Sequence, residues 1–216
     1  VVLTNEDRGY WGCLPNIEVI PNAAMHVSDR YSDVTEKRII AVGRLDYQKG
    51  FDRLIRAWEI VQRNSYFADW HLDIFGQGEW QEMLQQMIDE RNLQDTIRIN
   101  HPTKQIGDEY VRSSMLVMSS NYEGFPMVMI EAMACGLPVV SFDYKCGPKD
   151  IIKDGENGLL VRNGDIQALA DAMMKVMVDQ EYRKRLSKNA LNVVSTYSEE
   201  TVMNKWISMF TSLTER

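Results

Sequence analysis

The sequence predicts an α/β fold, namely a doubly wound parallel sheet with helices on both faces. Three observations support this prediction. Short apolar runs alternate with longer stretches of helical periodicity, which is typical of βαβ units. The runs at residues 39–42 and 115–118 end at a glycine and at a polar turn. A chain of 216 residues, 44% of them hydrophobic, can also bury a good core as one or two domains.

Six apolar runs of strand type make up the predicted sheet, at residues 39–42, 71–75, 97–99, 115–118, 138–142 and 158–161. Helical patterns fill the remaining intervals, at residues 51–64, 79–91, 105–113, 126–135, 166–178, 180–195 and 199–213. In the first of these helices the apolar residues recur on one face at a spacing near 3.6, and they are Phe51, Leu54, Ile55, Trp58 and Val61. No internal repeat or long linker interrupts the alternation.

The strand–loop–helix segment at residues 115–135 has the form of an anion site. We expect Pro126 at the first helical position, where its missing N–H leaves no partner unsatisfied. The amides of Met127, Val128 and Met129 would then lie in the first turn without intrahelical partners. This turn is the positive end of the helix dipole, so it is suited to phosphate.

Two glutamates accompany this helix start. Glu131 lies about one turn inside the helix, and helical side chains lean back toward the N-terminus. Its carboxylate can therefore reach a polyol beside the phosphate, such as a ribose. Glu123 lies in the loop that faces the same space. The alternative interpretation is a pair of solvated carboxylates, because two glutamates at a given spacing are common by chance.

A second candidate phosphate element follows the strand at residues 39–42. Arg44 and Lys49 lie in the loop that leads from this strand to the helix beginning at Phe51. In open parallel sheets, ligands bind at the carboxyl edge of the strands. A guanidinium fork and an ammonium point charge both complement a diphosphate. The alternative interpretation is a solvated basic turn.

The turn Gly76-Gln77-Gly78 imitates the start of a dinucleotide fingerprint. The third glycine position of that fingerprint is Gln81 here. The acid expected at the end of the next strand is also missing, because Asp95 precedes that strand. The simpler interpretation is a tight turn that needs glycine for a positive φ. This interpretation argues against NAD binding.

Together these segments resemble the retaining glycosyltransferases of the GT-B fold, family four. The resemblance covers residues 17–214, and its motifs occur in the family's order and at its distances. They are Val42-Gly43-Arg44-Leu45 with Lys49-Gly50, Glu123-Gly124-Phe125-Pro126 with Glu131-Ala132-Met133-Ala134, Gly136-Leu137-Pro138-Val139-Val140, and Asp154-Gly155-Glu156-Asn157-Gly158-Leu159-Leu160-Val161. The resemblance implies a Rossmann-like domain, the C-terminal half of a GT-B fold.

The resemblance also implies a role for each matching residue. Arg44 and Lys49 would hold the donor diphosphate, and Glu131 would hold the ribose. Glu123 would face the donor sugar, and it would act in catalysis together with Arg44 and Lys49. The remaining donor contacts would come from the loop and first helical turn, that is from Gly124, Phe125, Pro126, Met127 and Val128.

The base of the donor is expected at the loop of His101, Pro102 and Thr103, held largely through backbone groups. A solvated loop histidine is the alternative interpretation of His101. Downstream, the segment Tyr144 to Asp150 departs from the commonest family form, which has a Gly-Gly turn and a glutamate. This departure puts a role for the Asp150 carboxylate in doubt.

The implied reaction moves a hexose or N-acetylhexosamine from a nucleotide diphosphate sugar, with UDP as the expected nucleotide. The implied acceptor is a glycan or lipid-linked glycan in surface polysaccharide synthesis. The enzyme would need no cofactor and no metal ion, because cationic side chains and helix amides stabilise the leaving phosphate. Two other functions stay open: a non-catalytic nucleotide-sugar binding module, and a sugar-nucleotide epimerase of GT-B build.

The resemblance divides the chain into three parts. Residues 1–22 would be the end of an N-terminal domain and the crossover, and residues 23–196 the donor-binding domain. Residues 197–216 would form a helix that returns toward the N-terminal domain, which is absent here and would bind the acceptor. We therefore expect this chain to bind a nucleotide-sugar and, by itself, not to turn it over.

Composition limits the expected partners. The formal net charge of −7 argues against a nucleic-acid partner, because binding to a phosphate backbone requires a basic surface. The sequence also contains no polybasic patch that would bind a membrane. No apolar run approaches a membrane span. Cys13, Cys135 and Cys146 lack metal-type spacing and cannot all pair. A reducing cytoplasm is thus the expected location, with peripheral contact of the full enzyme at the inner face of the membrane.

Overall fold

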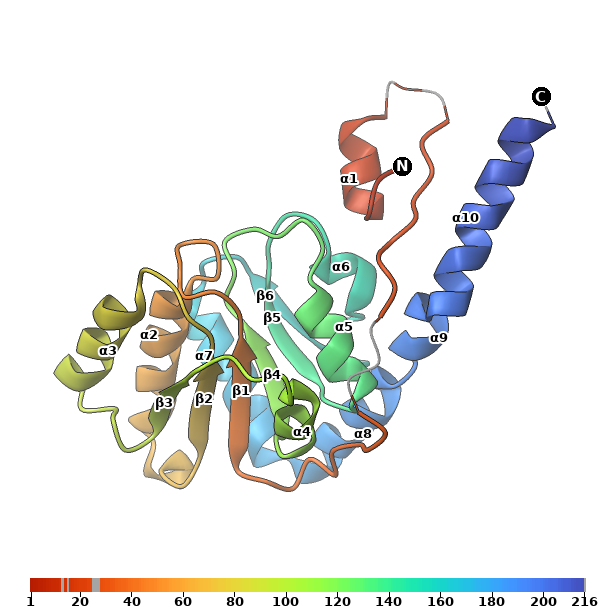
Figure 1. Cartoon of the computed structure of the whole chain (residues 1–216). Coiled ribbons are helices and arrows are strands. Elements are labelled where there is room, and N and C mark those ends of the chain that lie inside the picture. Colours follow the sequence, from red (N-terminus) through yellow and green to blue (C-terminus); the bar gives the residue numbers. More distant parts are fainter. Residues whose placement is uncertain (13, 15, 25–27, 216) are drawn as a thin grey trace.

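The computed structural model of the chain describes residues 1–215 except 13, 15 and 25–27 (Figure 1). Cys13 therefore lies outside the described residues. The other two cysteines are free thiols. Cys135 is buried in the core, and Cys146 is partly exposed.

One six-stranded sheet forms the centre of the molecule, and every strand pairing in it is parallel. The strands run in the order β3-β2-β1-β4-β5-β6. Their bounds are β1 (Arg38–Val42), β2 (His71–Phe75), β3 (Ile97–Asn100), β4 (Met115–Met118), β5 (Val139–Asp143) and β6 (Gly158–Arg162). The predicted fold class is confirmed, since all six expected strands form within one residue at either end.

The strand order reverses between β1 and β4, which are neighbours in the sheet. The helices that follow these two strands lie on opposite faces of the sheet (Figure 1). In open α/β sheets this switch point is where ligands bind. The topology thus brings the loop after β1 and the loop after β4 side by side.

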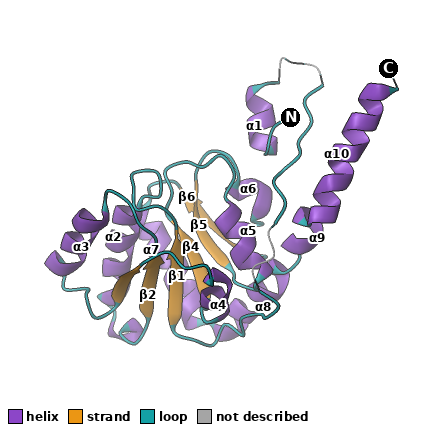
Figure 2. Cartoon of the chain, viewed as in Figure 1, coloured by secondary structure: helices purple, strands orange, loops and turns teal. Residues whose placement is uncertain are grey.

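Helices cover both faces of the sheet (Figures 1 and 2). The predicted helices appear as α2 (Phe51–Gln62), α3 (Gln81–Glu90), α4 (Ile106–Val111), α5 (Met127–Ala134), α7 (Ile166–Val178), α8 (Gln180–Ala190) and α10 (Glu199–Thr214). On one face α2 packs against α7, and on the other α4 packs against α5. Three short elements were not predicted, namely α1 (Asn5–Tyr10), the 3-10 helix η1 (Ser65–Phe67) and α6 (Pro148–Ile151).

Two predicted helix boundaries are wrong. The helix expected at residues 180–195 is interrupted after Ala190, and α9 (Val193–Tyr197) follows as a separate element. The interruption lets the buried side chains of Val193 and Tyr197 pack toward α5. Pro126 is the N-cap of α5 and not its first helical residue, because its backbone has ψ 78° and is not helical.

The N-terminal segment and α10 lie together beyond one end of the sheet (Figure 1). The backbone of Val2 bridges to that of Val19, and α1 contacts α6 and the loop that precedes it. In that contact the Asn5 side chain donates to Asp150 Oδ1 at 2.7 Å, and the Cys146 amide donates to Glu6 Oε2 at 2.8 Å. The division of the chain at residues 22 and 196 remains a prediction.

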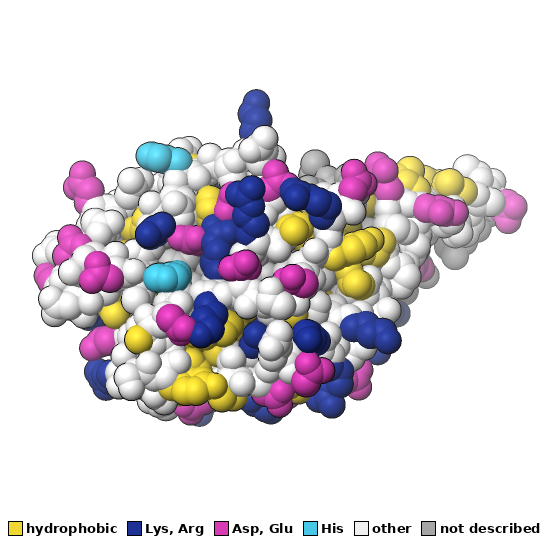
Figure 3. All heavy atoms as spheres, turned by 90° about the horizontal axis from the view of Figure 1, so that it is seen from below, with side chains coloured by type: hydrophobic (Ala, Val, Ile, Leu, Met, Phe, Trp, Pro, Cys, Tyr) yellow, Lys and Arg dark blue, Asp and Glu magenta, His cyan; other side chains and the backbone are white. Residues whose placement is uncertain are grey.

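Figure 3 views the molecule from the amino ends of the strands, and basic and acidic side chains alternate on this surface. Arg38 shows why, since it pairs with Asp73 at 2.5 Å and with Glu109 at 2.6 Å. Lys37 pairs with Asp69 in the same region. Charge of both signs is therefore paired along this edge.

Within the described residues, no helix is both long enough and apolar enough to cross a bilayer.

A buried arginine on α8 donates hydrogen bonds to α7 and to the segment before β1. The Arg183 guanidinium is 4% exposed and donates to Val34 O at 2.8 Å, and to the carbonyls of Val176 and Met177 at 2.8 and 3.0 Å. It also lies 5.3 Å from the centre of the Trp70 ring. The carbonyls of Val176 and Met177 belong to the last turn of α7, where a cation complements the helix dipole.

We predict that Arg183→Met lowers the free energy of unfolding by about 3 kcal/mol, because buried carbonyl groups lose their donors. Urea denaturation of the purified chain measures this change. The control is Arg185→Met, an exposed position on the same helix, for which we expect a change within about 0.5 kcal/mol. Equal effects of the two substitutions would contradict the assigned role of Arg183.

Candidate functional site

The two loops at the switch point are joined by hydrogen bonds. The Asn121 amide donates to Gln48 O at 2.7 Å, and the Asn121 side chain donates to Tyr47 O at 2.5 Å. The Ser119 hydroxyl donates to Lys49 O at 3.0 Å. The loop after β1 and the loop after β4 are therefore held as one unit.

Glu123 is the centre of the charged network in this unit. Its Oε1 lies 2.6 Å from Lys49 Nζ and accepts from the Ser120 hydroxyl at 2.7 Å. Its Oε2 accepts from Gln48 Nε2 at 3.0 Å. The side chains of Glu123 and Lys49 are only 7% and 14% exposed. A charge so far removed from water needs its partner, because an unpaired buried charge is strongly unfavourable.

Arg44 is held differently, because its side chain is 70% exposed. The guanidinium reaches Asp46 Oδ2 at 3.3 Å through Nε, and it donates to Gln48 Oε1 at 2.9 Å through Nη2. A guanidinium has five N–H donors, so donors remain for a ligand. The geometry thus gives one enclosed cation, Lys49, and one cation at the surface, Arg44.

A cavity of about 370 Å³ opens beside Arg44 at the carboxyl edge of the sheet. Its walls come from the ends of β1 and β2, the loop after β3, and helices α4 and α5. The lining residues are Val42, Gly43, Arg44, Phe75, Gly76, Gln77, Pro102, Thr103, Ile106, Tyr110 and Glu131. The cavity therefore combines mostly apolar walls with a cation and a carboxylate, which is typical of small-molecule sites.

Two glycines allow the close packing at the mouth of this cavity. A Cβ on Gly76 would lie 1.9 Å from the carbonyl oxygen of Gly43, so only glycine fits there. The expected positive φ is wrong for Gly76, because glycine is required by this close approach and not by the backbone angle. A Cβ on Gly43 would lie 2.8 to 3.0 Å from Cε, Cδ and Cγ of Lys49. The aliphatic stem of Lys49 thus runs directly over Gly43. This places the Lys49–Glu123 pair next to the cavity wall.

Glu131 is the carboxylate in the cavity wall, and it is partly buried. Burial raises the pKa of the Glu131 carboxyl. The Tyr110 side chain is 0% exposed, and its hydroxyl has no hydrogen-bond partner among the residues that the structure describes. Two polar groups of this wall are therefore poorly satisfied in the ligand-free protein.

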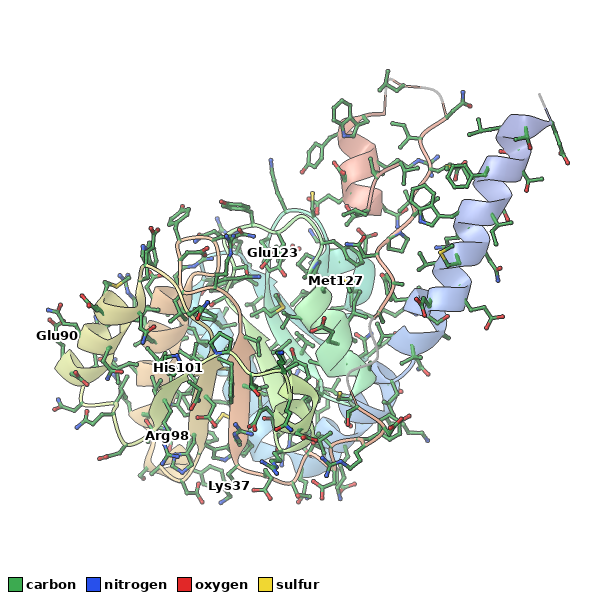
Figure 4. All side chains as sticks on the ribbon, viewed as in Figure 1. Lys37, Glu90, Arg98, His101, Glu123 and Met127 are labelled. Atoms are coloured by element: carbon green, nitrogen blue, oxygen red, sulfur yellow. The ribbon has the colours of Figure 1, made fainter. Side chains whose placement is uncertain are left out.

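The structure brings some predicted site residues together and separates others. Arg44, Glu131, Pro102 and Thr103 line the cavity, whereas His101 is exposed and is not among the lining residues. Figure 4 shows His101 after β3, away from Glu123. Pro102 and Thr103 thus line the cavity, and the role of the His101 loop in holding the base stays a prediction.

The start of α5 differs from its prediction. We expected the amides of Met127, Val128 and Met129 to lack intrahelical partners and so to be free for a ligand. Two of them instead donate to the preceding loop, Met127 N to Phe125 O and Met129 N to Pro126 O, both at 3.0 Å. The Phe125 ring packs against Tyr197 at 5.8 Å, and the space next to Gly124 is open. The residues from Gly124 to Val128 do not line the cavity. This helix start consequently offers fewer free donors than the sequence suggested.

The sequence analysis did not assign Asp46, Gln48 and Ser120, which contact Arg44 or Glu123, or Tyr110, which lines the cavity. Gln48 and Ser120 are polar residues in the two predicted ligand loops, so their position gave a weak signal. Tyr110 gave none, because one tyrosine within a helical pattern looks like an ordinary core residue. The described residues contain no group of three or more His, Cys, Asp or Glu that could hold a metal ion.

Comparison with known proteins adds independent information. A family model described as Glycosyl transferases group 1 matches residues 28–193. The chain is 34% identical to the amylovoran biosynthesis glycosyltransferase AmsD of Erwinia amylovora, covering 95% of this chain and 60% of that protein. It is 31% identical to the poly(ribitol-phosphate) alpha-N-acetylglucosaminyltransferase of Staphylococcus aureus, covering 92% of this chain and 39% of that protein. The chain thus spans well under two thirds of both relatives.

A solved structure shows the same architecture. Crystalline TarM of S. aureus, in complex with fondaparinux, alpha-GlcNAc-glycerol and UDP, superposes on this chain with a TM-score of 0.87. The sequences are 28% identical, and the match covers 97% of this chain and 43% of TarM.

We predict that Glu131→Gln raises the melting temperature at pH 8, and that this gain shrinks as the pH falls toward 4.5. Burial raises the pKa of Glu131 in the folded state above the ordinary value of 4.5. Between the ordinary pKa of 4.5 and the higher folded-state pKa, the folded protein therefore binds more protons than the unfolded chain. The stability of the wild type accordingly falls as the pH rises through the folded-state pKa. Glutamine removes this unfavourable ionisation.

Thermal unfolding of both proteins at several pH values measures the difference. The control is Glu79→Gln, an exposed position, which should give no pH-dependent gain. A gain for Glu131→Gln that is the same at pH 8 and pH 4.5 would contradict the burial of an ionised carboxylate.

Proposed function

The chain belongs to the glycosyl transferases group 1 family, and we propose that it forms the part of such an enzyme that binds the nucleotide diphosphate sugar. One observation carries this proposal: Arg44 and Glu131 line a single cavity at the switch point of the sheet, and the stem of a second cation, Lys49, packs against Gly43 in the cavity wall. Figure 4 shows Glu123 and Met127 at this edge, and Lys37 and Arg98 at the opposite one.

The donor would lie across the two loops. Its diphosphate would sit between Arg44 and Lys49, since a guanidinium fork and an ammonium ion both bind phosphate oxygens strongly. Glu131 would accept a hydrogen bond from a ribose hydroxyl deeper in the cavity. The base would rest near Pro102 and Thr103, which close the far wall of the cavity.

Binding of the diphosphate would rearrange the ion pair of Lys49. In the ligand-free structure the ammonium group is neutralised by Glu123 at 2.6 Å. A diphosphate carries more negative charge than one carboxylate and would compete for Lys49. Glu123 would then keep its bonds from Ser120 and Gln48 and turn its remaining acceptor capacity to hydroxyl groups of the donor sugar.

The chemistry follows from where charge develops. As the sugar leaves, negative charge grows on the β-phosphate, while positive charge grows at the anomeric carbon. Arg44 and Lys49 would stabilise the departing phosphate, and one such preorganised group typically contributes about 3 kcal/mol to the transition state. Such a site works without a metal ion or cofactor. The anomeric configuration would be retained, with the departing phosphate oxygen as the base.

The donor and acceptor classes are part of the same proposal. A UDP-bound hexose or N-acetylhexosamine is the donor that we favour, because UDP is present in the TarM complex. A surface glycan or lipid-linked glycan is the acceptor that we favour, because one relative is named as an amylovoran biosynthesis glycosyltransferase and another as a poly(ribitol-phosphate) alpha-N-acetylglucosaminyltransferase. The acceptor would bind to a further domain, at the cytoplasmic face of the membrane.

We predict that Lys49→Ala and Glu131→Ala each weaken UDP binding at least tenfold. The lost interactions are hydrogen bonds to charged groups, worth about 1.5–3 kcal/mol each, and tenfold corresponds to about 1.4 kcal/mol. Isothermal calorimetry on the folded chain measures the dissociation constants. Lys37→Ala is the matched control, because Lys37 is an exposed, paired lysine at the opposite edge of the sheet.

Lys49→Ala leaves Glu123 without its ion-pair partner and can therefore also lower stability. Arg44→Ala covers this case, since Arg44 is 70% exposed and its removal should leave the fold intact while weakening UDP binding to a similar extent. Wild-type affinity in the Arg44 and Glu131 variants would refute the site. A thermal-shift comparison of UDP, GDP and ADP then identifies the base.

A further inference from the structure

Gln48 connects the surface half of the site to its enclosed half. Its Oε1 accepts from Arg44 Nη2 at 2.9 Å, and its Nε2 donates to Glu123 Oε2 at 3.0 Å. Arg44 is 70% exposed and Glu123 only 7%. A single neutral side chain thus contacts both the outer cation and the inner carboxylate.

The backbone of Gln48 is fixed as firmly as its side chain. Its carbonyl oxygen accepts from the Asn121 amide at 2.7 Å. On either side of it, Asn121 binds Tyr47 O, and Ser119 binds Lys49 O. The side chain therefore starts from a point that the neighbouring loop holds in place, and this is what a group that orients others requires.

A side-chain amide is suited to both contacts. The oxygen of the amide faces a guanidinium, and its NH₂ group faces a carboxylate, so each end meets the charge that it favours. A carboxylate at this position could accept from Arg44 but could not donate to Glu123. An ammonium group could donate to Glu123 but could not accept from Arg44.

The connection matters most when a ligand is bound. If the diphosphate draws Lys49 away, Glu123 loses its ion pair in a place that is 7% exposed. The hydrogen bonds from Gln48 and Ser120 then hold the carboxylate in position. At its oxygen end, Gln48 limits the motion of the exposed Arg44 side chain. This contact reduces the conformational entropy that Arg44 loses when the ligand binds.

We propose that Gln48 is a positioning residue of the donor site, which aligns Arg44 with the diphosphate and Glu123 with the donor sugar through one amide. This inference rests on the proposed function, since it concerns the same ligand. Gln48 belongs neither to the quoted family motifs nor to the residues that line the cavity, so this role is additional to theirs. Gln48 acts through its two neighbours and need not touch the ligand.

The first experiment compares UDP binding by the wild type, Gln48→Met, Arg44→Ala and the double variant, using calorimetry. Methionine keeps the length of the side chain and removes both hydrogen bonds. We expect about fivefold weaker binding for Gln48→Met. In the Arg44→Ala background the same change should weaken binding less than twofold, because effects of residues that act through one another are not additive.

The second experiment uses Gln48→Glu, which keeps the acceptor for Arg44 and places a carboxylate against Glu123. The charged groups around this position are Arg44, Asp46, Lys49 and Glu123. Two carboxylates in contact cannot both ionise easily, so one of them takes up a proton as the pH falls. The protonated group can again donate, as the amide does in the wild type.

We therefore expect Gln48→Glu to bind UDP at least tenfold more weakly than the wild type at pH 8 and within about threefold of it at pH 5. The ratio to the wild type at each pH removes the titration of UDP itself. Tyr47→Glu is the charge-matched control, since Tyr47 is 60% exposed. Its ratio should stay constant, because an exposed glutamate has a pKa of about 4.3.

The outcomes separate the two proposals. A wild-type chain that binds no UDP would refute the proposed function. A wild-type chain that binds UDP, together with unchanged affinity of Gln48→Met, additive effects with Arg44→Ala, or a pH-independent ratio for Gln48→Glu, would refute only the role of Gln48. Melting temperatures of all variants are measured in parallel, and a role limited to stability would lower them without producing the pH-dependent recovery.

Discussion

Lys49 and Glu123 are 74 residues apart in the sequence, and their ion pair joins the two loops at the point where the strand order reverses. Its 2.6 Å distance and its burial require both side chains to be fixed. Gly43 provides the path for the lysine stem, and Ser120 and Gln48 hold the carboxylate. Arg44 and Glu123 likewise make their hydrogen bonds and ion pairs with residues of these two loops.

The parallel topology makes this arrangement possible. Neighbouring strands β1 and β4 send their following helices to opposite faces of the sheet, which leaves a crevice between the two loops. On the other side of β1, Gly76 lets the loop after β2 approach the Gly43 carbonyl more closely than any Cβ would permit. The backbone therefore shapes the wall of the site, and the side chains determine its charge.

A buried polar group in the core has its hydrogen-bond partners, whereas one in the cavity wall has none among the described residues. Arg183 is buried in the core, and carbonyl groups accept its hydrogen bonds. In the cavity wall, by contrast, the Tyr110 hydroxyl lacks a partner among the described residues, and burial raises the pKa of Glu131. Poorly satisfied groups that face a cavity are unfavourable for stability and available to a ligand, which is the pattern expected of a binding site.

The sequence by itself determined the sheet, most of the helices, and the loops that carry the site. Periodicity reports which face of a segment is buried, and six parallel strands leave few topologies to choose from. Arg44, Lys49 and Glu131 could be assigned because each lies at the carboxyl end of a predicted strand or in the helix after it. The short elements α1 and α6 were not predicted, since four to six residues carry too little periodic signal.

Only the tertiary structure decided which side chains are partners. The sequence assigned Lys49 to a phosphate and Glu123 to a sugar, but it could not show that they bind each other in the ligand-free protein. Gln48 and Glu123 meet across 75 residues of sequence. Such contacts depend on strand order, loop path and side-chain rotamers together, and none of these is a local property of the chain. For the same reason the amides at the start of α5 turned out to be partly satisfied by the preceding loop.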